Sequence, residues 1–343
     1  MDTRGSRTPS ALFPTLALLA ACACAEQAAP APDAGSPDAG RVEQDAGSAH
    51  DASTLDPPDA ASPPDTGGEG CSGYSAATVA GALPAPLNET SGLAMSAAHP
   101  GVLFAHNDSG DTARFFALDI EGNLLGEFLL AGATAADWED LAIGPCPTGS
   151  CVYLGDFGDN NRVRTDHSLY RVPLPEVDVG QSLGTVNVTW ERLPFQYPSG
   201  TKWNAETLLV HPQTGEVYVL NKLPAGNAST VFRFPQPLTP EVQATLTQVA
   251  VLPVPTSSDA QLTGGDIHPC GDALLLRTYT RLYELRLPAG AVSFEEIFTT
   301  SDYRTVPVAV EPQGEAVTYQ PSGSGYVTAS EGRGAAINIY SCQ

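Results

Sequence analysis

The chain is poor in positive charge. Of its 343 residues 16 are Lys or Arg and 39 are Asp or Glu, which gives a formal net charge of −23, and Lys202 and Lys222 are its only lysines. A strongly acidic protein is repelled by phosphate backbones and by anionic lipid headgroups. The composition therefore argues against nucleic acid and anionic membrane surfaces as partners.

Signatures of common enzyme classes are also missing. The sequence has no G-x-S-x-G nucleophile elbow, no H-E-x-x-H zinc motif and no G-x-x-x-x-G-K-[ST] phosphate loop. Helical periodicity is nearly absent, and the apolar run at 11–21 is too short to cross a bilayer as a helix. Because none of these enzyme motifs is present, the sequence leaves open whether the protein is an enzyme.

The N-terminus has the order of an export signal. Arg4 and Arg7 precede the apolar run, and "LAAC" (19–22) closes it, which predicts a signal peptide over 1–21. "LAAC" resembles a bacterial lipobox, and this resemblance places a lipid on Cys22. We expect an exported lipoprotein whose partner is the bilayer, at the bacterial outer membrane or cell surface.

Residues 22–70 continue from Cys22 into a stretch of Ala, Pro, Asp, Gly and Ser with imperfect repeats such as "APDAG" and "SPDAG". Such a composition has little apolar surface to bury, so it predicts a disordered tether. The folded domain is expected over 71–343 and is expected to act as a monomer.

The cysteines suggest an oxidising compartment. Cys146 and Cys151 bracket "PTGS" and could bridge a local hairpin, while Cys71 and Cys342 lie at the two ends of the domain. Spacing alone does not fix pairing, and the roles of Cys24 and Cys270 stay open.

Four short β-rich runs recur along the domain, separated by Gly, Pro, Asn and Asp. The clearest set is "AETLLVHP" (205–212), "EVYVLNKL" (216–223), "STVFRFPQP" (229–237) and "TQVAVLPVP" (247–255). The last set has three runs, and "YSAATVAGAL" (74–83) can supply its fourth. This predicts an all-β fold, a five-bladed β-propeller of four-stranded antiparallel blades closed by an N-terminal strand, with six blades as the alternative. Closure would also bring Cys71 beside Cys342.

A glutamate recurs at one position of this repeat. Glu139, Glu206 and Glu315 each lie six residues before a proline, whereas Thr263 and Ser91 occupy the corresponding places in the other two repeats. First strands line the channel of a propeller, so these residues should face one space. Like charges in such a site need a counter-charge, and the sequence therefore predicts an acidic channel mouth.

Polar turns follow the second run of each repeat, as in "HNDSGD" (106–111) and "GDFGDNN" (155–161). Oxygen ligands in Gly-rich turns suit Ca²⁺, although tight turns use the same residues for structural reasons. The candidate metal ligands are Glu139, Glu206, Glu315, Asp156 and Asp159.

Paired carboxylates would also serve glycoside hydrolysis. In that reading Glu206 is the acid and Asp108 or Glu139 the base, and Trp138 and Trp203 could stack on a sugar. The candidate ligand-binding residues near these acids are Trp138, Trp203, Asn107, His106, Asn160, Lys222 and Arg277. His167 is a second histidine in these turns.

The motifs "HNDSGD", "DWEDLA", "GDFGDN" and "NAETLL" resemble those of exported bacterial β-propeller lipoprotein-like proteins of unassigned activity. The resemblance covers about 88–223 and implies a propeller whose acids form one site. The acid-rich rim is more distantly similar to phytase-type propellers, but the scarcity of lysine speaks against phosphate chemistry. We expect a cation or small polar ligand at the channel mouth. A carbohydrate-active hydrolase and a protein-interaction platform are the alternatives.

Overall fold

The computed structural model describes residues 71–224, 227–253 and 261–343. The predicted signal peptide, Cys22 and the tether lie outside these residues. Among the described residues no helix is long and apolar enough to cross a membrane.

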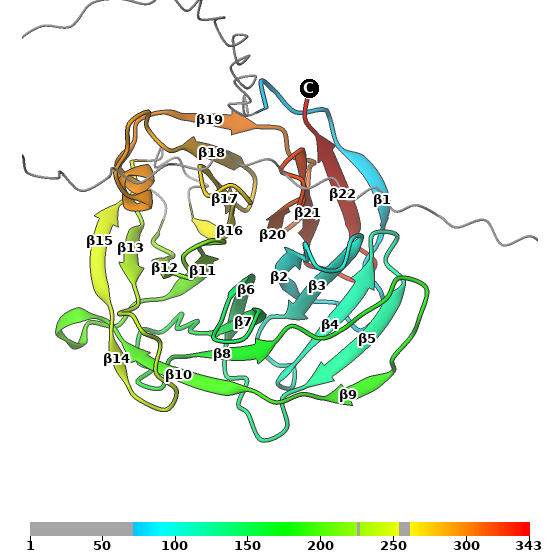
Figure 1. Ribbon diagram of the computed structural model, residues 1–343, viewed down its shortest axis with the longest axis horizontal. Coiled ribbons are helices and arrows are strands. Elements are labelled where there is room, and N and C mark those ends of the chain that lie inside the picture. The colour runs from blue at the N-terminus through cyan, green and yellow to red at the C-terminus, as the bar shows by residue number, and fades with distance from the viewer. Residues whose placement is uncertain (1–70, 225–226, 254–260) are drawn as a thin grey trace, which may run out of the picture. The chain divides into compact units, whose positions relative to one another are not determined.

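Five mainly antiparallel sheets surround one axis, each with its first strand nearest the centre (Figure 1). Blade 1 contains β2 (Thr90–Met95), β3 (Val102–Asn107), β4 (Arg114–Asp119) and β5 (Leu124–Leu129). Blade 2 contains β6 (Trp138–Pro145), β7 (Ser150–Asp156), β8 (Ser168–Pro173) and β10 (Glu191–Gln196). Blade 3 contains β11 (Ala205–Val210), β12 (Val217–Asn221), β13 (Thr230–Arg233) and β15 (Thr247–Val251).

Blade 4 contains β16 (Leu262–Ile267), β17 (Ala273–Thr278), β18 (Leu282–Arg286) and β19 (Tyr303–Val306). Blade 5 contains β20 (Gly314–Tyr319), β21 (Gly325–Ser330) and β22 (Ala336–Ser341), and β1 (Thr78–Ala82) is its outermost strand. The predicted five-bladed propeller and its closure by an N-terminal strand are confirmed. The described residues form five blades, so the six-bladed alternative is wrong.

The closure is also covalent. β1 pairs with β22, Tyr74 bridges to Cys342, and Cys71 and Cys342 form a disulfide with a Cα–Cα distance of 5.3 Å. Cys146 and Cys151 form the second predicted disulfide, across the β6–β7 turn. Both pairs join the residues that the sequence suggested.

Two short strands join a neighbouring blade. β9 (Thr185–Asn187) pairs parallel with β5 of blade 1, and β14 (Ala244–Thr245) pairs parallel with β10 of blade 2. The repeat of β-rich runs predicts one strand over "TVNVTWERLPF" (185–195), but these residues are divided between two blades. These strands fasten blades 1, 2 and 3 to one another along their outer edges.

The repeat of β-rich runs also predicts a strand at "FEEIFTT" (294–300), and this prediction is wrong. It forms the 3-10 helix η2 (Phe294–Thr299), with a capping box from Ser293 and Glu296 at its start. Phe294, Ile297 and Phe298 are its buried residues, a spacing of three and four that suits a helix. The fourth strand of blade 4 is β19 instead. A second 3-10 helix, η1 (Pro198–Gly200), precedes blade 3.

The core lies between adjacent blades, because both faces of each sheet are covered. Between blades 1 and 2, Phe104, Phe115, Trp138, Leu154 and Tyr170 pack into one buried cluster. Their burial fixes the positions of the innermost strands, on which the candidate site is built.

Candidate functional site

Every innermost strand has a β-bulge at the same place. One residue is inserted between two paired positions in each of these strands, and the inserted residues are Ser91, Glu206, Thr263, Glu315 and, in β6, one of Glu139 and Asp140. These are the repeat positions identified in the sequence. A bulge redirects the side chain of the extra residue, so the recurrent Glu owes its orientation to a repeated backbone feature.

The hydroxyl residues at this position join neighbouring blades. The Ser91 hydroxyl donates to the Glu139 carbonyl in blade 2, and the Thr263 hydroxyl donates to the Gly314 carbonyl in blade 5 at 3.0 Å. Blades 2, 3 and 5 carry glutamate instead, and all three glutamates are buried.

A second repeated position lies at the end of each second strand. Its residues pair with the residue that precedes the bulge, and they are Asn107, Asp156, Asn221, Thr278 and Ser330. All five are buried. Asn107 accepts backbone N–H groups of Asn88 and Glu89, and Asp156 accepts those of Ala136 and Asp137. These side chains therefore hold the loops that lead into the innermost strands.

The residue after this position reaches the bulge glutamates. In blades 1, 3, 4 and 5 it is Asp108, Lys222, Tyr279 and Glu331, each half-buried, and in blade 2 it is the apolar Phe157. Together with Asp137 and the three glutamates, these side chains meet at one end of the axis. We call Asp108, Asp137, Glu139, Glu206, Glu315 and Glu331 the acidic cluster.

Three of these acids come especially close. One carboxylate oxygen from each of Asp108, Asp137 and Glu139 lies within 4.8 Å of the others. Gly158 packs against two of them, because a Cβ added there would lie 2.0 Å from Glu139 Oε1 and 2.5 Å from Asp137 Oδ2. Its amide also donates to the Asp137 carbonyl at 3.0 Å. Glycine at 158 therefore makes room for this carboxylate group.

Lys222 places an ammonium group beside the cluster. Its ammonium donates to Glu206 Oε2 at 2.5 Å and to the Tyr279 hydroxyl at 2.6 Å. The Asn204 amide donates to Glu206 Oε1 and to Asn160 Oδ1, each at 3.2 Å. Asn160 and Lys222, both predicted ligand-binding residues, thus border the cluster, with Asn160 connected through Asn204.

Burial is the largest cause of the raised pKa values in the acidic cluster. It raises the pKa of Glu139 well above its usual range, and the carboxylates of Glu206, Asp108 and Asp137 add to this effect. Burial likewise raises the pKa of Glu315 to about 7 and that of Asp137 to about 6. The pKa of Glu331 rises to about 9, since it is partly desolvated and lies beside Glu315. The cluster therefore retains protons near neutral pH, as mutually repelling buried acids do.

Glu206 and Lys222 form a buried ion pair. Burial raises the pKa of Glu206 to about 7 even though the ammonium lowers it. Burial lowers the pKa of Lys222, but the combined effects of Glu206 and the Tyr279 hydroxyl outweigh it and raise that pKa above its usual value. Lys222 therefore remains an ammonium group.

Asp140, the neighbour of Glu139, serves a different purpose. Its carboxylate accepts the backbone N–H of Leu141 in blade 2 and of Leu208 in blade 3, at 2.8 and 2.9 Å. Asp266 makes a similar connection from blade 4, accepting the N–H of Tyr319 in blade 5 at 2.8 Å. These carboxylates satisfy backbone groups on the inner edges of neighbouring blades. In "DWEDLA", Glu139 therefore belongs to the cluster and Asp140 links blades.

Several predicted site residues lie outside the cluster. Trp138 is 1% exposed, with its ring against His106 and Tyr170. Burial lowers the pKa of His106 to about 4, and its Nδ1 donates to the Asn107 carbonyl at 2.7 Å. Arg277 is 0% exposed and pairs with Glu311. Packing and internal bonds hold these three side chains away from the cluster, and His106 Nε2 and Arg277 Nη1 are buried without a hydrogen-bond partner.

The loop after β7 is held by its own polar groups. Asp156 pairs with Arg164 at 2.8 Å, and Asp159 accepts the backbone N–H groups of Val163 and Arg164. Buried His167 stacks on Phe195. Trp203 is partly exposed, with the Arg162 guanidinium 5.9 Å from its ring centre. The structure gives Asp156 and Asp159 partners within the protein instead of bringing them to the cluster.

Asp137, Tyr279 and Glu331 belong to the site but were not singled out from the sequence. Tyr279 and Glu331 occupy the repeat position of Asp108 and Lys222, one residue beyond the end of the second strand. Aligning the repeats on that strand end would have identified both.

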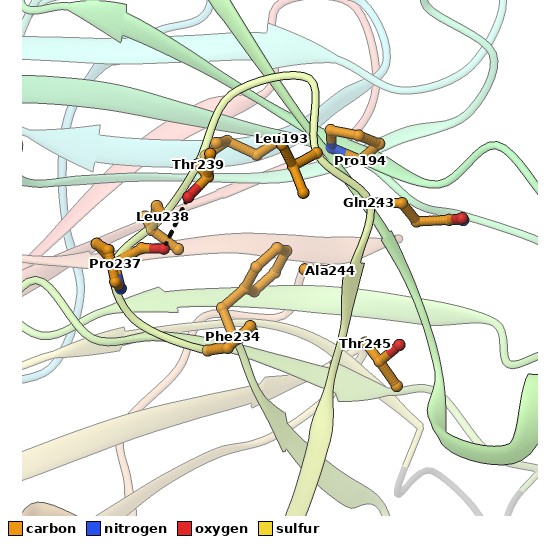
Figure 2. Close-up of a pocket in the computed structure, with 11 residues that line it drawn as sticks. Leu193, Pro194, Phe234, Pro237, Leu238, Thr239, Gln243, Ala244 and Thr245 are labelled. Carbon is orange, nitrogen blue, oxygen red and sulfur yellow. Dashed lines mark hydrogen bonds between the residues drawn. The ribbon is translucent and has the colours of Figure 1, made fainter.

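A pocket of about 240 Å³ lies away from the cluster, between the outer strands of blades 2 and 3 (Figure 2). Apolar groups such as Leu193, Phe234, Pro237 and Leu238 line it. It shares no residue with the acidic cluster.

No protein-family model and no curated protein matches this chain. Similar solved structures include the PQQ-bound aldose sugar dehydrogenase of Streptomyces coelicolor, with 13% identity, 79% of this chain and 99% of that chain covered, and a TM-score of 0.41. An auxiliary nutrient binding protein of Bacteroides thetaiotaomicron shares 10% identity over 75% and 70% of the two chains, with a TM-score of 0.43. A putative 6-phosphogluconolactonase of Bacteroides uniformis shares 14% over 76% and 68%, with a TM-score of 0.36. Likeness this distant assigns no activity.

Proposed function

We propose that this propeller binds a divalent cation of the Ca²⁺ type at the acidic cluster, with Asp108, Asp137 and Glu139 as protein ligands. The distance among their oxygens carries the proposal. Ca²⁺ holds oxygen ligands at roughly 2.3–2.6 Å, so two oxygens on one ion are at most about 5 Å apart. The limit of 4.8 Å for this trio fits that span.

The charge balance supports the same proposal. Six carboxyl groups meet around the single ammonium of Lys222 in the cluster, and that ammonium is already bonded to Glu206. A cation would replace the protons that the raised pKa values retain. The ligand atoms are carboxylate oxygens, which suit a hard cation better than zinc or copper.

Thermal unfolding of the full-length protein tests the proposal. The melting temperature should rise when Ca²⁺ is added after chelation, since a ligand at a hundredfold excess over its Kd stabilises the folded state by about 2.7 kcal/mol. Glu139→Gln should lose this rise, whereas Glu121→Gln, at an exposed acid outside the cluster, should keep it. An equal rise in wild type and Glu139→Gln would refute the site.

A carbohydrate-active hydrolase is the second candidate function. The pKa of Glu206, raised to about 7, would keep a carboxylic acid available beside Glu139 and Asp108. The bond from Lys222 favours ionised Glu206 and weakens this candidate. Glu206→Gln would abolish turnover of a glycoside by such an enzyme while leaving it folded, and unchanged turnover would dismiss the acid role.

We further propose that the protein is exported and held at the bacterial envelope by a lipid on Cys22. The disulfides Cys71–Cys342 and Cys146–Cys151 support export. Wild type should partition into the detergent phase of a detergent–water separation, and Cys22→Ala should move to the aqueous phase. Wild type remaining in the aqueous phase would refute the anchor.

A further inference from the structure

The site formed by the acidic cluster together with Lys222 and Tyr279 has two chemically different halves. Asp108, Asp137 and Glu139, from blades 1 and 2, form the proposed cation site. Blades 3, 4 and 5 contribute two pairs, Glu206 with Lys222 and Glu315 with Glu331, and the hydroxyl of Tyr279. The second half therefore combines hydrogen-bond donors and acceptors beside the proposed metal.

Donors remain available in this half. An ammonium group has three N–H bonds, and Lys222 uses one on Glu206 and one on Tyr279. Because the Tyr279 oxygen accepts from Lys222, its own hydrogen can be donated outward. Both side chains are half-buried, so each reaches the surface of the cluster while its position is fixed by the other.

A buried acceptor faces the same space. Glu315 is 3% exposed, and its Oε2 has no hydrogen-bond partner. Glu331 lies beside it and can donate a hydrogen bond only while it is protonated. Once Glu331 is ionised, Glu315 loses this donor, and a hydroxyl group supplied from outside would replace it.

The class of ligand follows from these groups. A hydroxyl group both donates and accepts, so it can satisfy Tyr279 and Glu315, whereas a carboxylate or phosphate would be repelled by the surrounding acids. Ca²⁺ takes six to eight oxygens, and three side chains leave positions that water or ligand hydroxyls can fill. Two adjacent hydroxyl groups could replace two waters on the ion.

We propose, resting on the cation site above, that the protein binds a neutral polyhydroxylated compound, a sugar or polyol. Two neighbouring hydroxyl groups coordinate the cation, and further hydroxyl groups bond to Lys222, Tyr279 and Glu315. The metal half fixes the ligand's orientation, and the hydrogen-bonding half selects hydroxyl groups over charged substituents.

Saturation-transfer NMR on the full-length protein tests the proposal. The probes are neutral sugars and polyols with adjacent hydroxyl groups (mannose, galactose, fucose and myo-inositol), with glucuronate as the anionic comparison. We expect a signal from at least one neutral compound in Ca²⁺, loss of that signal in chelator, and none from glucuronate. Ca²⁺ binding itself is measured separately by calorimetry.

Tyr279→Phe separates the two halves. It removes one hydroxyl group and keeps the ring, whose centre lies 4.8 Å from Lys222 Nζ. Sugar binding should weaken roughly tenfold, as for one lost hydrogen bond, and Ca²⁺ affinity should stay unchanged. Tyr283→Phe, at a buried tyrosine of blade 4 without a hydroxyl partner, is the matched control and should change neither.

The outcomes distinguish the two proposals. Ca²⁺ binding without a signal from any neutral compound would overturn the sugar proposal and leave the cation site standing. Equal sugar signals in Ca²⁺ and chelator would overturn coordination through the metal. Absence of Ca²⁺ binding would overturn the cation site itself, and the sugar proposal with it.

Discussion

A bulge in each innermost strand directs the recurrent glutamates of this propeller. Glu139 and Asp140 are adjacent in sequence, yet Glu139 joins the acidic cluster while Asp140 bonds to backbone groups of blades 2 and 3. The bulge in β6 separates their directions. At the scale of single residues, the chemistry of the site therefore depends on backbone geometry as much as on side-chain type.

Gly158→Ala tests how closely the carboxylates are packed. The new Cβ would collide with Glu139 and Asp137, so at least one carboxylate must move. We expect Ca²⁺ affinity to fall at least tenfold, because ligand positions within a few tenths of an ångström are lost. Isothermal calorimetry gives this affinity directly. Gly73→Ala, where nothing lies within 4 Å of the new atom, should leave it unchanged.

Sequence reasoning identified the recurrent glutamates but not all of their companions. Glu139, Glu206 and Glu315 keep a constant distance from a proline, which makes them visible in one sequence. Tyr279, Glu331, Lys222 and Asp108 share a position but differ in chemistry, so no pattern of residue type joins them. Their equivalence becomes visible only when the repeats are aligned on the end of the second strand.

At the scale of elements, carboxylates on the innermost strands connect neighbouring blades. They accept hydrogen bonds from backbone N–H groups that would otherwise lack a partner. Asp140 and Asp266 accept backbone N–H groups of the next blade, and Ser91 and Thr263 donate to backbone carbonyls there. Buried backbone groups need such partners. The innermost strands are therefore held by side chains as well as by their own sheets.

Asp140→Asn should destabilise the protein by about 1–3 kcal/mol, since an amide keeps one acceptor oxygen and places an N–H₂ group against backbone N–H donors. Chemical denaturation in the presence of chelator measures this loss. Glu139→Gln is the matched comparison one residue away. In chelator it should be neutral or stabilising, because it removes repulsion among the acids. Equal losses in both variants would contradict the linking role of Asp140.

Strand order was predictable for most of the chain, because turn residues mark off short β-rich runs. The prediction failed where local sequence and tertiary pairing disagree. "FEEIFTT" is rich in β-forming residues, but the capping box and the burial of Phe294, Ile297 and Phe298 favour a helix. The run 185–195 reads as one strand, although its first part pairs with another blade. Pairing across blades leaves no mark in the local sequence.

At the scale of the whole molecule, the buried acids make stability depend on pH. Glu206 and Glu315 have pKa values raised to about 7, and Asp137 to about 6. Through these acids the folded protein holds more protons than the unfolded chain between about pH 4 and 7, whereas the lowered pKa values of His106, His167 and His211 act in the opposite direction. Because the acids with raised pKa values outnumber these histidines, we expect stability to fall as pH rises through that range.

In chelator we expect a higher melting temperature near pH 5 than at pH 8, with a difference in unfolding free energy of roughly 1–3 kcal/mol. Added Ca²⁺ should reduce or reverse this trend, because the cation binds the deprotonated carboxylates. Differential scanning calorimetry at the two pH values checks both statements. A chelated protein that is more stable at pH 8 would contradict the raised pKa values.

The disulfides should differ in importance. Cys71 and Cys342 are 271 residues apart, whereas Cys146 and Cys151 are 5 apart. Closing a longer loop restricts the unfolded chain more, so Cys71→Ser with Cys342→Ser should cost roughly 2–5 kcal/mol. Denaturant titration should show a smaller loss for Cys146→Ser with Cys151→Ser. The reverse order would mean that loop length does not govern their effects.

The closure also determines how the domain bears tension. Tyr74 bonds to Glu284 in blade 4, Arg304 donates to the carbonyls of Cys71 and Ser72, and Cys71 is covalently joined to Cys342. If the preceding chain pulls on residue 71, that tension meets these bonds first. The tension passes through the disulfide into blade 5 and through the charge-assisted hydrogen bonds of Arg304 into blade 4 before it reaches β1. The load is shared between two blades, so β1 is protected from being peeled away one hydrogen bond at a time.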